Sequence, residues 1–231
     1  MRLTRIKTLP VMISGETQPV GIIRDGLLDM QRRRVTYWSV HLNKARRSVL
    51  VSASRSALSE NSVRLDLSDA ALLKSCDSAE DLDEDTLATG TLPDVLAANG
   101  SDADGPPLRG IQRVLSLLER AWRPTIPEKP ANAPASWVWG SEVTGKPFFT
   151  SEGELGRISD IEINERDAAL RQVQVSQGGG VTLHINIEAM RHIPEGNSHF
   201  VARSAIRRPT VGNDPVPPSR QTEAGGGRPE A

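Results

Sequence analysis

The chain has 231 residues, of which 37% are hydrophobic and only 3% aromatic, and its formal net charge is −1. This length allows two small domains, and the near-zero net charge gives no bulk signal for binding to nucleic acid or a membrane. Cys76 is the only cysteine, which excludes an internal disulfide, and no segment has the roughly 18 apolar residues of a transmembrane helix. The basic N-terminus lacks the apolar run of a signal peptide, so we expect a soluble cytoplasmic protein.

The charges are unevenly distributed along the chain. Residues 1–65 contain 12 Lys and Arg against 4 Asp and Glu, whereas residues 66–105 contain 1 against 11. We expect these two oppositely charged regions to attract one another within the chain.

Short alternating segments predict half-buried strands in the first part of the chain, over residues 20–29, 35–42, 49–51 and 63–67. Residues 54–58 fit one helical turn. Ser68 fits the N-cap of a short helix over residues 69–74.

The middle of the chain differs in composition. Residues 76–107 are acidic and rich in Ala, Gly and Ser, which indicates a linker, with brief helical turns expected at 82–87 and 93–96. Residues 108–122 follow a helical period, with an apolar stripe of Ile111, Val114, Leu115, Leu118 and Trp122. This amphipathic helix is expected either to pack on one of the β units or to bind a partner.

Strands are predicted again in the last part of the chain, over residues 158–163, 170–175, 181–187 and 199–202. Gly178–Gly180 is predicted to form a hairpin turn. From residue 207 the chain is rich in Pro and Gly and is expected to be disordered.

The two strand-rich parts are copies of one unit. Val20–Asp25 returns as Leu155–Asp160, 135 residues later, and we align Val49 with Val181, where the offset falls to 132. Gly21 and Gly156 lie inside strand patterns and predict sharp bends. Asp25 and Asp160 occupy equivalent positions, where a turn or strand-end hydrogen bond explains them better than acid–base catalysis.

The second copy resembles the opening of the PRC-barrel domain. Ser141–Phe149 contains a Gly-Lys-Pro strand start, and a Gly/Glu turn then leads into Gly156–Asp160. The first copy is similar to a more diverged version, and together the two cover more than half of the chain. The resemblance implies a small β-barrel that serves as an interaction or assembly module, as in the photosynthetic reaction-centre H subunit and in a ribosome maturation factor. It implies no shared catalytic residues.

The predicted fold is therefore mainly β, with two small PRC-like β-barrels joined by an acidic linker that carries one amphipathic helix. The expected divisions are a first barrel, a linker, a second barrel and a disordered tail, over residues 1–75, 76–135, 136–206 and 207–231. Each barrel would be marginally stable alone, so we expect the two to pair about a pseudo-twofold axis.

No motif predicts catalysis, a metal ion or a cofactor. Gly140–Lys146 matches a phosphate-binding loop, but Pro147 replaces the required Ser or Thr and a strand pattern follows, which indicates a structural turn. The three histidines of the second copy, His184, His192 and His199, lack the spacing of zinc ligands. The acidic run beside Cys76 disfavours its thiolate.

A protein partner is the expected ligand, and the candidate contact residues are Arg32, Arg33, Arg34, Arg46, Arg47, Ile111, Val114, Leu118 and Trp122. The sequence thus favours a non-enzymatic scaffold or assembly module that mediates protein–protein interaction in a bacterial cytoplasm, including with a membrane-associated complex. The alternative is an RNA- or ribosome-associated maturation factor, in which the five arginines would meet at one hairpin and contact phosphates.

Overall fold

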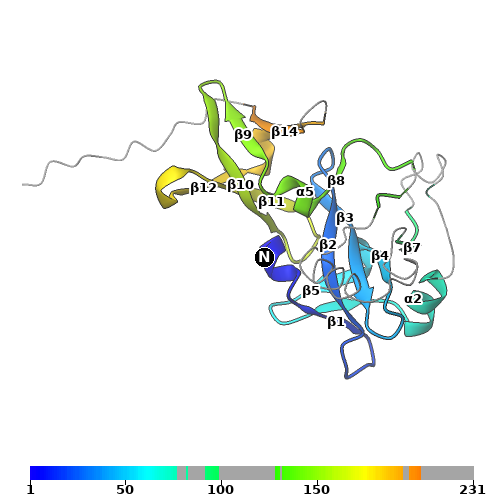
Figure 1. Ribbon diagram of the computed structural model, residues 1–231. Coiled ribbons are helices and arrows are strands. Elements are labelled where there is room, and N and C mark those ends of the chain that lie inside the picture. Colours follow the sequence, from blue (N-terminus) through cyan, green and yellow to red (C-terminus); the bar gives the residue numbers. More distant parts are fainter. Residues whose placement is uncertain (77–81, 83–91, 99–127, 131, 195–197, 204–231) are drawn as a thin grey trace, which may run out of the picture.

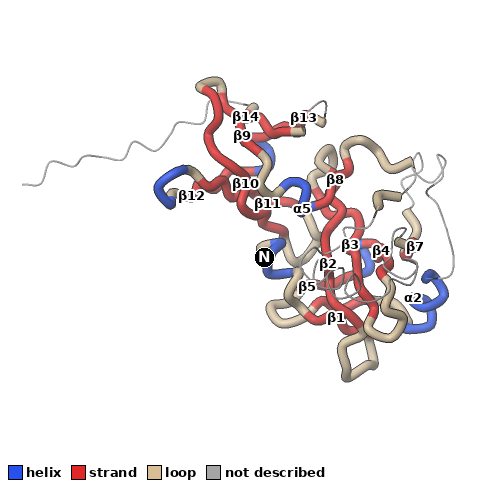
Figure 2. The backbone as a smooth tube through the Cα atoms, viewed as in Figure 1, coloured by secondary structure: helices blue, strands red, loops and turns tan. Residues whose placement is uncertain are grey.

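The described residues form two β-sheets, with α5 (Gly140–Val143) and the N-terminal helix α1 (Leu3–Ile6) between them and α2 (Asp69–Cys76) on the far side of the first sheet (Figure 1, Figure 2). The computed structural model describes residues 1–76, 82, 92–98, 128–130, 132–194 and 198–203. The amphipathic segment with Ile111, Val114, Leu118 and Trp122, and the tail from residue 207, lie outside the described residues. Strands dominate the described part, which confirms the prediction of a mainly β protein.

The first sheet contains β1 (Pro10–Ile13), β2 (Gly21–Asp29), β3 (Arg34–Leu42), β4 (Ser48–Ser52), β5 (Ser56–Leu58), β6 (Val63–Leu65), β7 (Val95–Ala97) and β8 (Trp137–Trp139). The second contains β9 (Pro147–Thr150), β10 (Gly153–Ile163), β11 (Leu170–Ser176), β12 (Thr182–Asn186), β13 (Met190–Ile193) and β14 (His199–Ala202). The helices are α1 (Leu3–Ile6), α2 (Asp69–Cys76) and α5 (Gly140–Val143), with 3₁₀ turns η1 (Ala53–Arg55), η2 (Gly178–Gly180) and η3 (Ile187–Ala189). No described helix has the length and apolar character needed to cross a membrane.

The two sheets repeat one topology. In each, the first strand pairs antiparallel with the long second strand and parallel with the last strand of the unit (β1 with β2 and β6; β9 with β10 and β14). The long strand continues into a three-stranded meander, β2-β3-β4 or β10-β11-β12. Even the irregularities recur, because the register shifts after Ile23 in one sheet and after the equivalent Ile158 in the other. The predicted duplication is therefore a duplication of structure.

Neither sheet closes on itself through pairings of the described strands. The strand order runs from β5 to β7 in the first sheet and from β12 to β13 in the second, with those strands at the ends. The structure thus confirms the mainly β character, while the described pairings leave two open sheets in place of closed barrels.

The register corrects the predicted alignment of the fourth strands. Val49 pairs with Val40, and Leu183 pairs with the equivalent Val175, so Val49 corresponds to Leu183 rather than to Val181. The offset is 134, because the turn before β12 is one residue shorter, not three. The error is an even number of residues and therefore leaves each side chain on the predicted face.

Part of the predicted linker belongs to the first sheet. Val95–Ala97 was expected near a helical turn, but it forms β7 and pairs with β4. Leu82, Leu92 and Leu96 pack in an apolar cluster with Tyr37 and with Leu27, Leu50, Trp137 and Trp139 on the outer face of this sheet. Burial of these side chains and pairing with an open edge outweigh the local helical preference.

Two smaller predictions have mixed outcomes. Ser68 caps α2 as expected, since its hydroxyl accepts a hydrogen bond from the Ala71 amide at 3.2 Å. Residues 54–58 are not one helical turn, because a 3₁₀ turn ends at Arg55 and β5 follows.

The described acidic residues of the 66–105 region pair with basic residues of the first 65 residues, as predicted. Asp94 binds the Arg55 guanidinium through both carboxylate oxygens, at 2.8 and 2.9 Å, and Lys44 pairs with Asp69 at 2.6 Å. These pairs join the acidic segment to the basic first sheet.

The glycine inside each long strand is required by a close backbone approach. A Cβ at Gly21 would overlap the carbonyl oxygen of His41, and a Cβ at Gly156 would overlap that of the equivalent Ser176. Both predicted bends are thus places where the long strand crosses closely over its neighbour.

We predict that Gly156→Ala lowers the free energy of unfolding by about 2 kcal/mol or more, because the backbone of β10 or β11 must move. Gly178→Ala is the matched control, since a Cβ there has nothing within 4 Å. Urea unfolding of both variants checks this, and equal stability of the two would contradict it.

Candidate functional site

The junction between the two sheets is built by an exchange of segments. The lead-in segments, defined here as residues 1–7 and 137–144, each precede one unit but pair with the long strand of the other. In the second lead-in segment, β8 pairs antiparallel with β2, with Leu28 opposite Val138. In the first, Arg2 forms a bridge with Glu162, and the Ile163 amide donates to the Met1 carbonyl at 2.7 Å.

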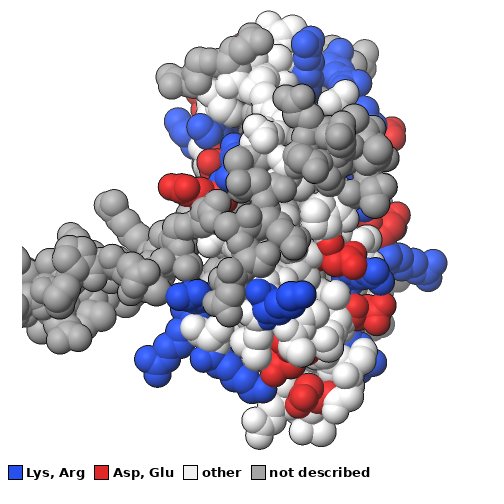
Figure 3. All heavy atoms as spheres, turned by 90° about the vertical axis from the view of Figure 1, so that its right-hand side faces the viewer, with Lys and Arg blue, Asp and Glu red and all other residues white. Residues whose placement is uncertain are grey.

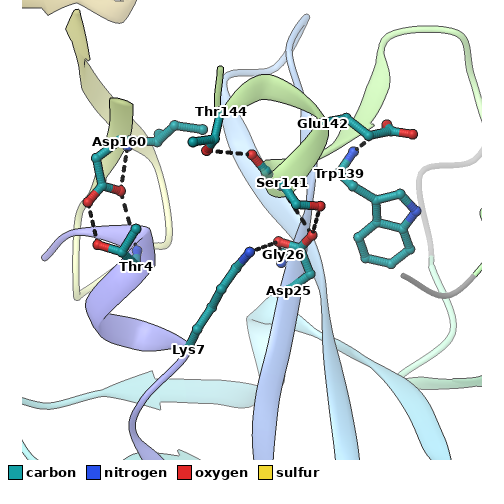
Figure 4. A network of polar contacts seen from close by, with 11 residues as sticks. Thr4, Lys7, Asp25, Gly26, Trp139, Ser141, Glu142, Thr144 and Asp160 are labelled. Atoms are coloured by element: carbon teal, nitrogen blue, oxygen red, sulfur yellow. Dashed lines mark hydrogen bonds and ion pairs between the residues drawn. The ribbon is translucent and has the colours of Figure 1, made fainter. Parts of the chain in front are cut away.

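A short helix in each lead-in segment then meets an aspartate of the other unit (Figure 4). The Asp25 carboxylate accepts hydrogen bonds from the Ser141 amide at 3.2 Å and the Ser141 hydroxyl at 2.5 Å, both on α5. The Asp160 carboxylate accepts from the amide and the hydroxyl of Thr4 on α1. In each helix, one backbone amide and one side-chain hydroxyl therefore donate to an aspartate of the other unit.

The register shift before each aspartate explains why it reaches the other unit. The shifts lie between Ile23 and Asp25 and between Ile158 and Asp160. A bulge adds a residue, bends the strand and re-aims the side chains that follow. The prediction of turn or strand-end hydrogen bonds is wrong in this respect, since both aspartates lie within long strands and bind across the junction.

Burial makes these contacts necessary. Asp25 is 2% exposed and Asp160 is 7% exposed. A buried carboxylate without hydrogen-bond partners is strongly destabilising. Lys7 adds an ion pair to Asp25 at 2.9 Å. Thr144 occupies the position equivalent to Lys7 in the other half, and its hydroxyl donates to the Gly140 carbonyl.

The contacts are reciprocal, as expected for an approximate twofold axis. Val35 donates its amide to the Ala168 carbonyl at 2.9 Å, and the equivalent Leu170 donates to the Arg33 carbonyl at 2.8 Å. Arg33 and Ala168 both have a positive φ, of 55° and 54°. The predicted pseudo-twofold pairing of the units is thus present in the structure, with Arg34 and Ala169 at its centre.

The two halves of the junction differ in their buried polar groups. In one half, the side-chain carbonyl of Gln174 accepts from the Arg2 guanidinium at 2.9 and 3.2 Å in the amide orientation that satisfies both groups. The equivalent positions in the other half hold Ser39 and Trp139. Their side-chain polar atoms are buried and have no hydrogen-bond partner among the described residues.

A groove runs along one side of the junction. Its larger part has a volume of about 580 Å³ and lies beside α5, and a second part of about 390 Å³ continues toward η3, with His192 and Pro194 lining both. Apolar side chains of Val138, Val143 and Phe200 lie beside Lys129 and Lys146 in the larger part. Met30 and Gln31 from the first unit line the smaller part. Both units therefore contribute to one groove.

Two lysines and one glutamate line the groove near His192. Burial of the imidazole, followed by the charges of Lys129 and of His199 and Lys146, lowers the pKa of His192, while Glu142 acts in the opposite direction. Glu142 is itself paired with Lys129 at 3.3 Å. The ring stacks on Phe200, and its Nε2 lies 2.8 Å from the Ser198 hydroxyl. A carboxylate entering this groove would meet cationic side chains next to an apolar wall.

The predicted arginine cluster does not form. Arg32 and Arg33 lie in the turn before β3, and Arg34 begins that strand, whereas Arg46 and Arg47 lie in the turn after it. A nine-residue strand separates the two groups by roughly 25 Å. Arg33 pairs instead with Glu188 at 3.4 Å.

Neither of the other chemical motifs acquires a reactive arrangement. The described residues contain no group of three His, Cys, Asp or Glu side chains that could hold a metal ion. His184 contacts Gln172, His199 contacts Phe149, and His192 stacks on Phe200, so the three histidines contact different residues. Gly140 of the loop-like motif starts α5 and lies against Leu3, where an added Cβ would clash.

The sequence did not lead us to predict the junction contacts of Thr4, Lys7 and Ser141. The equivalence of Thr4 and Ser141 is nevertheless visible in the sequence, because each hydroxyl residue stands six positions before a proline, Pro10 or Pro147. The different offset, 137 rather than 135, hides this match.

No family model and no curated protein matches this chain.

We predict that Asp25→Asn lowers the free energy of unfolding by about 2–3 kcal/mol, because Lys7 loses its buried partner. Ser141→Ala should cost about 1 kcal/mol. A double-mutant cycle between these positions, 116 residues apart, should show coupling of about 1 kcal/mol.

Asp66→Asn is the control for this cycle, since the Asp66 side chain is 83% exposed, and its effect should stay within about 0.5 kcal/mol. Strict additivity of Asp25→Asn and Ser141→Ala would show that the two side chains do not interact in solution.

Proposed function

We propose that this protein is a non-enzymatic scaffold of the PRC-barrel type that binds a protein partner in the groove between its two β units. The observation that carries the proposal is the composition of the groove, which combines an apolar wall with Lys129 and Lys146 and takes residues from both units. Such a lining suits an extended protein segment with an apolar side chain next to a carboxylate. Its action in the cytoplasm belongs to the same proposal.

The first unit binds part of its own linker as an added strand, and this supports a role in binding extended segments. β4 pairs with β7, Asp94 is held by Arg55, and the Tyr37 hydroxyl donates to the Pro93 carbonyl at 3.1 Å. Addition of a strand to a sheet edge, with side chains placed in pockets, is a common mode of peptide recognition.

The distribution of basic residues favours a protein partner over RNA. The two arginine groups lie at opposite ends of β3. On the face drawn in Figure 3, Lys and Arg side chains form separate groups with Asp and Glu between them. RNA-binding proteins usually present a continuous basic surface with stacking aromatics. RNA or ribosome association is therefore the alternative, and the capture experiment below distinguishes it from a protein partner.

The test is affinity capture with the full chain from lysate of its native host, with and without ribonuclease. We expect a protein to be recovered in near-stoichiometric amount, independently of ribonuclease. Lys146→Glu should reduce its recovery about tenfold, because the reversed charge repels a carboxylate in the groove. Arg171→Glu, on the exposed side of β11, is the matched control and should bind as the wild type does.

A second readout ties the partner to the groove. Addition of the purified partner should raise the pKa of His192, measured by NMR, because a bound carboxylate favours the imidazolium. Equal capture by wild type and Lys146→Glu would contradict the proposal, and recovery that ribonuclease abolishes would favour the RNA-associated alternative.

A further inference from the structure

The two equivalent strands β4 and β12 have different neighbours. β4 is covered on its outer edge by β7, with Leu50 opposite Leu96. β12 ends its sheet, and none of the described strands pairs with its outer edge. The duplicated unit therefore pairs with a further strand at this edge in one copy, and in the other copy no strand of the described ranges pairs with the same edge.

The sequence of β12 contains none of the features that normally protect an edge strand. Its residues, Thr182 to Asn186, include no Pro, Lys, Arg, Asp or Glu, and its pairing with β11 has no bulge. The other strands that end the sheets are shorter, and β13 carries Arg191. Val181, which immediately precedes β12, is the large apolar side chain most exposed among the described residues, at 39%. Natural proteins block exposed edges with charges, prolines or bulges unless the edge is used.

The backbone of β12 is oriented to accept a strand. The Gln177 amide donates to the Val181 carbonyl at 2.8 Å across the hairpin. Hydrogen-bonded and non-hydrogen-bonded pairs alternate along an antiparallel ladder, so Leu183 and Ile185 bond to β11. The N–H and C=O groups of Thr182, His184 and Asn186 consequently point away from the sheet.

The surroundings of β12 do not suit a strand such as β7. The apolar Leu27, Tyr37 and Leu50, which contact β7 and its flanks, are replaced at the equivalent positions by Glu162, Gln172 and His184. These three polar side chains hydrogen-bond to one another in a row. Ala189 occupies the position of Arg55, which holds Asp94 in the first unit. An occupant of this edge must therefore be polar on the outer face.

A second β12 meets these requirements. Its pattern is symmetric about His184: Thr182 and Asn186 are polar and exposed, while Leu183 and Ile185 are apolar and point to the buried face. In an antiparallel pair centred on His184, Leu183 of one copy lies opposite Ile185 of the other, and the polar residues adjoin the polar row. Only antiparallel pairing of identical edges gives a closed twofold dimer.

We propose that two copies of this chain dimerise through antiparallel pairing of β12 with β12, centred on His184, so that one continuous sheet runs through both second units. The proposal is independent of the partner groove, which none of the β12 residues lines. A contact of this size forms a weak dimer, as is usual for interfaces that bury less than about 1,200 Å².

Sedimentation velocity of the full chain, up to a concentration of about 0.1 mM, tests the proposal. The wild type should show a reversible monomer–dimer equilibrium. His184→Lys places two like charges opposite each other and should weaken the dimer at least about tenfold. His184→Pro removes the outward N–H while sparing the bonds to β11, and should have the same effect.

Ser176→Lys is the control, because Ser176 is exposed on β11 and not at the edge; this variant should dimerise as the wild type does. Circular dichroism and thermal melts verify that each variant is folded. Because the two His184 variants weaken the dimer by different means, either one tests the proposal if the other is unstable. A wild type that stays monomeric at 0.1 mM, or His184 variants that dimerise like the wild type, would overturn the proposal.

Discussion

Each long strand of this protein buries an aspartate that accepts hydrogen bonds from a short helix in the other half of the chain. Asp25 depends on Ser141 and Lys7, and Asp160 depends on Thr4. A buried carboxylate is stable only when its oxygens have hydrogen-bond partners. The amide of the following residue supplies one donor to each aspartate, and the lead-in segment of the other half supplies an amide and a hydroxyl. The continuous apolar core through both sheets follows from the same arrangement. The duplicated units are thereby held as one body, which relieves the marginal stability expected of a small β unit alone.

Divergence between the copies has changed what surrounds this shared junction. The outer face of the first sheet is apolar and covered by its own linker around Leu96, whereas the equivalent face of the second sheet carries the polar row around Gln172. The lead-in residue at the first helix position is Leu3 in one half and Gly140 in the other, and the leucine occupies the space that the glycine leaves. These differences leave a groove beside α5 and, within the described part of the chain, an edge of β12 with no paired strand. These are the two surfaces for which we propose the binding of other chains.

Much of the fold could be predicted from the sequence, because period-two alternation and the repeat around Gly21 and Gly156 are local signals. The close approaches at those glycines were anticipated as bends. The exchange of lead-in segments could not be predicted in this way, since it depends on contacts between residues more than 100 positions apart, such as Asp25 with Ser141. Strand β7 was missed because pairing with β4 decides its conformation. The prediction that the five arginines meet at one hairpin was wrong because the length of β3 keeps Arg34 and Arg46 apart.

Native-state hydrogen exchange on the full chain tests the interlocked junction most directly. The amides of Val35, Ile163 and Leu170 donate across the junction. If the two sheets form one cooperative body, these amides exchange only through global unfolding, with the same free energy as amides inside β3 and β11. Exchange of the three junction amides at a free energy several kcal/mol lower, with each sheet unfolding separately, would contradict the account.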